Sequence, residues 1–177
     1  MGEKTGPNPT DRAKTGTKRS LLTDGEGVPL SVVVAGANVN DFKLTEETLE
    51  KMVVERPAPP ASPCAGEAPK TESEGGVEQG LCLDADYFRK QIYELLEEWG
   101  YTAHIRPVGS GQSSAMTEEE KREAAVKARR WVVERTHSWL NRFRGLLIRW
   151  CKKPRNYLAM LHFACALIAY RAADLLG

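Results

Sequence analysis

At 177 residues the chain has the length of one domain, and two full-sized domains are not expected. Its formal net charge of +1 excludes a uniformly basic protein, but the cations are concentrated late in the sequence. Between Lys121 and Arg155 twelve basic residues stand against two acidic ones, a net charge of +10 that attracts polyanions such as nucleic acid. The N-terminus lacks a signal-peptide pattern and the cysteines form no C-x-x-C pair, which predicts a cytoplasmic protein with reduced thiols.

The first part of the chain predicts an arm, a hairpin, a helix and a loop. Residues 1–18 are rich in Gly, Pro, Lys and Thr, which predicts a polar N-terminal arm without regular structure. Two apolar, β-prone runs at 19–23 and 29–34 flank Asp24-Gly25-Glu26-Gly27, residue types that close a β-hairpin. Apolar residues at helical spacing predict a helix over 44–54. The proline-rich stretch 57–80 predicts a long, variable loop.

The rest of the chain alternates between strands and helices. Strands are predicted at 81–84 and 101–106, on either side of a helix at 86–99 that ends at Gly100 as its C-cap. Thr117 and the three glutamates after it begin a long helix, and a final, largely apolar helix covers 156–176. The long helix carries apolar residues on one side, namely Val132, Trp139, Phe143, Leu147 and Trp150. This order predicts the α/β class with a mixed α+β sheet.

The final helix contains an apolar run from Tyr157 to Tyr170. At 14 residues the run is shorter than the roughly 20 residues that cross a bilayer. We therefore expect a buried core helix and no membrane partner.

Two acidic residues occupy positions suited to chemistry. Asp84 ends a predicted strand, where a rigid element holds its side chain, and Glu134 lies on a helix face away from Val132. Two such carboxylates offer the oxygen ligands that Mg²⁺ or Mn²⁺ prefers. The pattern leaves simpler roles open: Asp84 as the cap of the next helix, and Glu134 in an i, i+4 pair with Arg130.

Several segments resemble insertion-sequence DDE transposases of the family numbered five. That family belongs to the superfamily of transposases named after the family numbered four. They include Gly2-Glu-Lys-Thr-Gly-Pro-Asn-Pro-Thr-Asp-Arg, Lys18-Arg-Ser-Leu-Leu-Thr, Leu81-Cys-Leu-Asp, Gly100-Tyr-Thr-Ala-His-Ile-Arg and, above all, Arg129-Arg-Trp-Val-Val-Glu-Arg-Thr-His-Ser-Trp-Leu-Asn-Arg-Phe-Arg. The resemblance covers nearly the whole chain.

The resemblance implies an RNase H-like catalytic domain over 19–177 that cuts and joins DNA during transposition. It makes Asp84 and Glu134 the second and third acids of a DDE site, which binds Mg²⁺ or Mn²⁺. It also implies phosphate contacts from Arg130, Arg135, Arg142 and Arg144. The implied partners are the transposon ends and target DNA, with either a homo-oligomer or an upstream-encoded part of the transposase.

One departure from the family pattern concerns the first Asp, which normally precedes the Gly-Glu-Lys-Thr-Gly-Pro stretch. Asp11 and Asp24 are the nearest substitutes, and both fit turns better. The chain is therefore expected to be the C-terminal catalytic part, an incomplete RNase H-like fold lacking its first central strand. A truncated inactive copy fits the same pattern, and the alternative function is a non-catalytic fragment that binds DNA or a transposase subunit.

Overall fold

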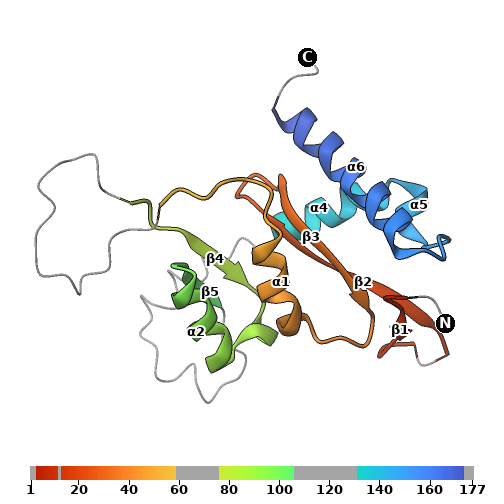
Figure 1. The fold of residues 1–177 in the computed structure, drawn as a ribbon, viewed down its shortest axis with the longest axis horizontal. Coiled ribbons are helices and arrows are strands. Elements are labelled where there is room, and N and C mark those ends of the chain that lie inside the picture. The colour runs from red at the N-terminus through yellow and green to blue at the C-terminus, as the bar shows by residue number, and fades with distance from the viewer. Residues whose placement is uncertain (1–2, 12, 59–75, 106–130, 174–177) are drawn as a thin grey trace, which may run out of the picture. The chain divides into compact units, whose positions relative to one another are not determined.

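The computed structural model describes residues 3–11, 13–58, 76–105 and 131–173, and it has a mixed α+β architecture (Figure 1). The chain forms two compact units. The first unit combines Met1–Val54 with Arg130–Gly177, and the second comprises Glu55–Arg129. The fold therefore agrees with the expected mixture of helices and strands.

The first unit is built on an antiparallel sheet of strand order β1-β2-β3. These strands are β1 (Gly6–Pro7), β2 (Thr15–Thr23) and β3 (Pro29–Gly36). The predicted hairpin is confirmed, with Ser20 opposite Val33 near its centre. The prediction of an unstructured arm over 1–18 is wrong in part, because 15–18 extend β2 and Gly6 pairs with Gly16. Strand pairing gives the backbone N–H and C=O groups of this polar segment hydrogen-bond partners, which its composition alone did not predict.

The hairpin turn is stabilised by the side chain of Asp24. Its Oδ1 accepts hydrogen bonds from the backbone N–H groups of Glu26 at 2.9 Å and Val28 at 2.8 Å. Gly27 adopts a φ of 85°, a conformation that residues with a Cβ rarely adopt. The residue types that predicted the turn are therefore the ones that form it.

Strand β3 is buried on both faces. Val33 and Ala35 pack with Leu44 at the end of η1 (Asp41–Leu44), beside the short helix α1 (Thr45–Glu50). The helix predicted over 44–54 is thus confirmed but shorter, because Lys51 leaves helical geometry with a ψ of 15°.

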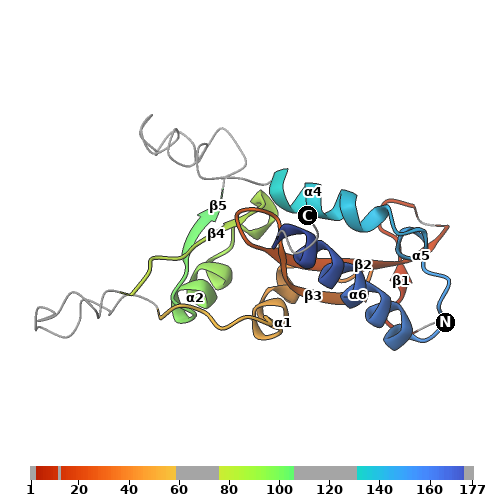
Figure 2. The ribbon, with the colours of Figure 1, turned by 90° about the horizontal axis from the view of Figure 1, so that it is seen from above.

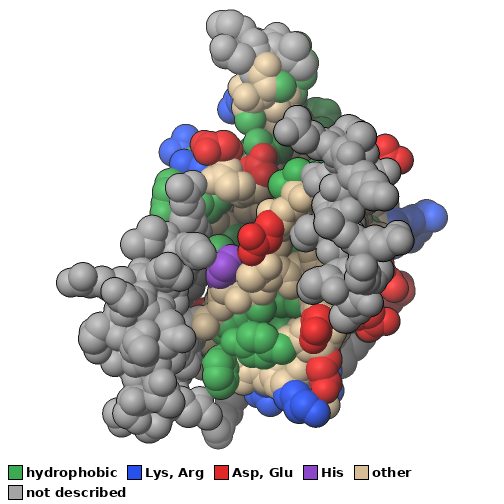
Figure 3. Space-filling view, turned by 90° about the vertical axis from the view of Figure 1, so that its left-hand side faces the viewer, with side chains coloured by type: hydrophobic (Ala, Val, Ile, Leu, Met, Phe, Trp, Pro, Cys, Tyr) green, Lys and Arg blue, Asp and Glu red, His purple; other side chains and the backbone are tan. Residues whose placement is uncertain are grey.

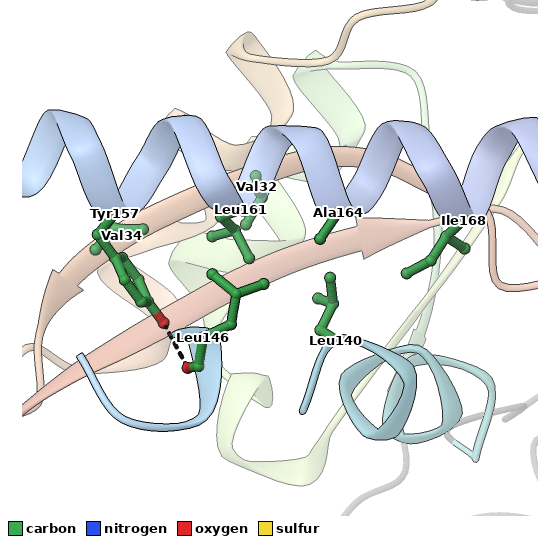
Figure 4. Close-up of a cluster of buried hydrophobic side chains, with 8 residues drawn as sticks. All are labelled: Val32, Val34, Leu140, Leu146, Tyr157, Leu161, Ala164 and Ile168. Atoms are coloured by element: carbon green, nitrogen blue, oxygen red, sulfur yellow. Dashed lines mark hydrogen bonds between the residues drawn. The ribbon is translucent and has the colours of Figure 1, made fainter. Parts of the chain in front are cut away.

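The other face of β3 carries the main core of the first unit. Helices α4 (Trp131–Asn141), α5 (Arg144–Leu147) and α6 (Pro154–Ala172) lie alongside the hairpin (Figure 2). Figure 4 shows side chains from α5 and α6 and from the strand pointing toward one another, with the Tyr157 hydroxyl donating to the Leu146 carbonyl at 3.2 Å. The buried cluster comprises Val32, Val34, Leu140, Leu146, Tyr157, Leu161, Ala164 and Ile168.

The prediction that one helix continues to Trp150 is wrong. Helix α4 ends at Asn141, and Phe143 has a non-helical ψ of 102° before α5 begins. Leu147 is therefore 60% exposed and Trp150 80% exposed. The buried line of α4 is instead Val132, Thr136 and Leu140, at i, i+4 and i+8. The predicted start of this helix at Thr117 lies outside the described residues.

The second unit contains a parallel strand–helix–strand motif. Strands β4 (Gly80–Leu83) and β5 (Thr102–Ile105) pair in parallel, and η2 (Ala85–Tyr87) and α2 (Lys90–Glu98) connect them. The predicted C-cap is confirmed, since Gly100 has a φ of 68° and its N–H donates to the Glu97 carbonyl at 2.9 Å. Most of the predicted 57–80 loop lies outside the described residues.

The surface view in Figure 3 shows both acidic and basic side chains, without one continuous patch of either sign among the described residues in view. In the whole described part of the chain, no helix combines the length and apolar character needed to span a membrane.

Candidate active site

Asp84 is the residue that directly follows strand β4. Its side chain is exposed, and its Oδ1 accepts a hydrogen bond from the backbone N–H of Ala85 at 2.6 Å at the start of η2. The capping role considered from the sequence is therefore present. It is compatible with a role as a ligand, because a carboxylate has two oxygens and can accept about four hydrogen bonds or metal bonds.

Glu134 lies in the first described turn of α4 and is exposed. The buried line of that helix faces the hairpin, so Glu134 projects away from the core, as its spacing from Val132 predicted. Ser138, one turn later, is also exposed on α4. Arg130, the expected i, i+4 partner and phosphate contact, lies outside the described residues.

Two neighbours of Glu134 fasten α4 to the hairpin turn. The Thr136 side chain is fully buried, and its hydroxyl donates to the Gly27 carbonyl at 2.7 Å. The Arg135 guanidinium donates to the Glu26 carbonyl at 2.5 Å. Glu134 is thus carried by a helix segment whose position is set by contacts with a distant part of the chain.

Arg135 also stacks on two indole rings. Its guanidinium carbon lies 4.7 Å from the Trp131 ring centroid and 4.9 Å from that of Trp139, within the range of cation–π attraction. Its Nε is buried and has no hydrogen-bond partner among the described residues. The family motif predicted a phosphate contact for Arg135 and not this packing role. The sequence did contain a signal for it, because Trp131, Arg135 and Trp139 are spaced four residues apart and so are neighbours on one helix face.

The other two predicted phosphate contacts lie at the break between α4 and α5. Arg142 and Arg144 are both exposed, and neither forms an ion pair with an acidic residue in the part of the chain that the structure describes. Within the described part of the chain no carboxylate neutralises either charge.

A further cation, Arg19, lies half-buried beneath the helices and was not identified from the sequence. One guanidinium nitrogen donates to Asn141 Oδ1 at 2.6 Å, while its Nη1 is buried with no partner in the described ranges. Burial and this cation lower the pKa of His137. Burial raises the pKa of the Cys165 thiol to about 11, against the opposing effect of Arg19. The sequence of β2 could have predicted this burial. Alternate residues of a strand lie on the same face, so Arg19 lies on the face of Leu21, which packs against the core.

The chemistry of the two acids fits a hard divalent cation, but the described residues contain no group of three or more His, Cys, Asp or Glu side chains placed to hold one. Asp84 belongs to the second unit and Glu134 to the first. Their convergence on one ion therefore stays a prediction.

Comparison with known proteins decides the family. The model of the family described as transposase DDE domain matches residues 2–169. The chain belongs to this transposase family. It is also 32% identical over 174 residues to a Burkholderia cepacia protein whose name describes it as a transposase for insertion sequence element IS402. The aligned region covers 97% of this chain and 72% of that relative. No solved structure matches the chain.

Membership of the transposase family confirms the main inference drawn from the Arg129–Arg144 motif. The chain is an insertion-sequence transposase by family and carries the DDE domain of a DNA-cleaving enzyme.

Proposed function

We propose that this chain cuts and joins DNA strands during transposition, with Asp84 and Glu134 as two acids of a divalent-metal site. The observation that carries the proposal is the match to a transposase DDE domain over residues 2–169, a span that contains both acids. The local geometry supports it, because both carboxylates are exposed and each is attached to a regular element.

Oxygen ligands from these two residues suit Mg²⁺ or Mn²⁺. Such an ion, when bound, supplies a Lewis acid that activates a water or 3′-hydroxyl and stabilises the leaving oxygen of a phosphodiester. The chain itself contributes the orientation of the ligands. The Ala85 N–H holds one oxygen of Asp84, and the contacts of Arg135 and Thr136 hold the helix that bears Glu134.

DNA is the proposed substrate, and exposed arginines are its proposed phosphate ligands. Arg142 and Arg144 are accessible at the end of α4, and Arg130 is proposed from its position in the family motif. Arg135 is proposed to act mainly by positioning α4, since its guanidinium already contacts the Glu26 carbonyl. Contacts of this kind hold the phosphate backbone without reading its sequence.

An RNase H-like fold is the proposed architecture, and the family numbered five is the proposed insertion-sequence family. Two local features support the fold: an antiparallel hairpin early in the chain and a parallel strand–helix–strand motif after it. A homo-oligomer or a second transposase polypeptide is the proposed protein partner.

The test is metal-dependent cleavage of DNA by the full chain, using the DNA that flanks its own gene as substrate. Asp84→Asn keeps an oxygen that can accept from the Ala85 N–H, and Glu134→Gln keeps the size of the side chain, so both variants should fold. Each should lose at least about 100-fold in cleavage rate, because an interaction with a metal contributes several kcal/mol to the transition state.

Matched controls are Asp86→Asn, two residues after Asp84, and Glu46→Gln, a first-turn glutamate of α1. Both should retain cleavage. Full activity of Asp84→Asn or Glu134→Gln would contradict the assignment of that residue. Salt-sensitive DNA binding by the unsubstituted chain, with no cleavage in Mg²⁺ or Mn²⁺, would instead favour the non-catalytic binding fragment.

A further inference from the structure

A cavity of about 520 Å³ lies in the first unit between the end of α4 and the last turns of α6. Its walls include two aromatic side chains, Trp139 and Phe143, and two cations, Arg142 and Arg171. The buried side chain of Ile168 contributes to the apolar part of the wall. The volume lies within the range of about 300–1,000 Å³ that small-molecule sites occupy.

The two cations of this cavity have no acidic partner among the described residues. None of the described residues that line the cavity is acidic. Neither Arg142 nor Arg171 forms an ion pair with an acidic residue of the described ranges. An occupant that carries an anionic group would therefore be attracted, whereas a purely apolar occupant would cover two guanidinium groups and leave them unpaired.

The aromatic walls restrict the occupant further. Trp139 is held by Arg135, whose guanidinium lies 4.9 Å from the ring centroid, and both Trp139 and Phe143 pack against the core cluster. Rings that are half-buried and held in this way lose little entropy when a flat ligand stacks on them. A flat base joined through a sugar to an anionic phosphate is the unit that nucleic acids repeat, and aromatic rings beside cations are the usual platform for single-stranded DNA.

We propose that this cavity binds one unpaired nucleotide of the DNA substrate. The base packs against Trp139 and Phe143, and the adjoining phosphates contact Arg142 and Arg171. This inference rests on the proposed function in one respect only, namely that the ligand is DNA. Paired bases in a duplex are stacked on their neighbours, so the cavity selects a nucleotide at a strand end or in a locally opened region.

The experiment compares binding of a short single-stranded oligonucleotide containing 2-aminopurine with binding of the same sequence as a duplex. The full chain should change the 2-aminopurine fluorescence of the single strand as the base stacks on an indole ring. Trp139→Leu should weaken single-strand binding by about 5- to 140-fold, the range that corresponds to removing one base–aromatic stack. Trp139→Phe should restore most of that affinity. Circular dichroism establishes that both variants fold.

The arginines are tested by the salt dependence of single-strand affinity. Arg142→Gln combined with Arg171→Gln should reduce the slope of log K against log salt by about 0.7 for each phosphate that the protein no longer neutralises. The control with the same change in charge is Lys152→Gln combined with Arg155→Gln, two exposed cations that do not line the cavity. This control should weaken single-strand and duplex binding to the same extent.

The outcomes separate this inference from the proposed function. Equal effects of the cavity variants and the control on single-strand binding would overturn the nucleotide site, as would an unchanged 2-aminopurine signal on binding. Neither result concerns duplex binding or cleavage by the unsubstituted chain, so the proposed function would stand. Loss of duplex binding alone in the Arg142 and Arg171 variant would assign the two arginines to duplex phosphates and would also overturn the site.

Discussion

The contact between Gly27 and helix α4 leads to a prediction about stability. Gly27 has a φ of 85°, and a Cβ at this position would lie 2.9 Å from Thr136 Oγ1 and 3.1 Å from Arg135 Nη2. Replacing Gly27 with Ala therefore introduces backbone strain and a steric clash. The strain costs about 1–3 kcal/mol. Displacing the Thr136 hydroxyl from the buried Gly27 carbonyl costs about 1–3 kcal/mol more.

We expect Gly27→Ala to lower the free energy of unfolding by about 2–6 kcal/mol, a large part of the 5–15 kcal/mol typical of a domain. The measurement is urea unfolding followed by circular dichroism, and the midpoint should fall on the order of 1 M or more. Gly25→Ala is the matched control, because a Cβ at residue 25 would have no atom within 4 Å of it. It should change stability by less than about 1 kcal/mol.

A second substitution tests the cause of the effect. Thr136→Val keeps the shape of the side chain but removes the hydroxyl, which should cost about 1–3 kcal/mol because the Gly27 carbonyl loses its donor. Both substitutions act on one contact, so the double variant should be less destabilised than the two single effects predict together. Equal midpoints for Gly27→Ala and Gly25→Ala, or strict additivity with Thr136→Val, would refute the anchoring of α4 by this turn.

Two further predictions concern titratable groups around Arg19. Burial and Arg19 lower the pKa of His137 below its ordinary 6.5, so the unfolded state binds that proton more readily and stability should decrease as the pH falls below about 6.5. Urea unfolding at several pH values should show this decrease, and His137→Gln should make it smaller; an unchanged profile would count against it. Burial raises the pKa of Cys165 to about 11, so its thiol stays protonated at neutral pH. Mass spectrometry after brief iodoacetamide treatment should find the exposed Cys82 alkylated before Cys165, and equal labelling would disprove the burial of Cys165.

Local patterns were enough to predict most elements of the fold. Asp24 to Gly27 predicted the hairpin turn because an Asp side chain and a glycine with positive φ stabilise such a turn within a few residues. Gly100 predicted the end of α2 for a similar reason. The motif around Glu134 was specific enough to predict the transposase family, which the comparisons confirmed.

Other features depend on residues that are distant in the sequence. The long helix ends at Asn141, and it is fastened by contacts between residues 109 positions apart, Arg135 with Glu26 and Thr136 with Gly27. Periodicity within one segment contains no information about such contacts, so the apolar spacing suggested a helix that continues to Trp150.

The amino-acid sequence by itself determined the family, the turns and the order of strands and helices, because these depend on short motifs and local backbone preferences. Only the tertiary structure decided which charged side chains are buried against other residues and which stay exposed to solvent. Arg19 is half-buried against Asn141, 122 positions away, and Arg135 stacks between two indole rings, while Arg142 remains exposed beside a cavity. The physical reason is that burial and pairing of a charge are set by whichever distant residues the fold brings next to it.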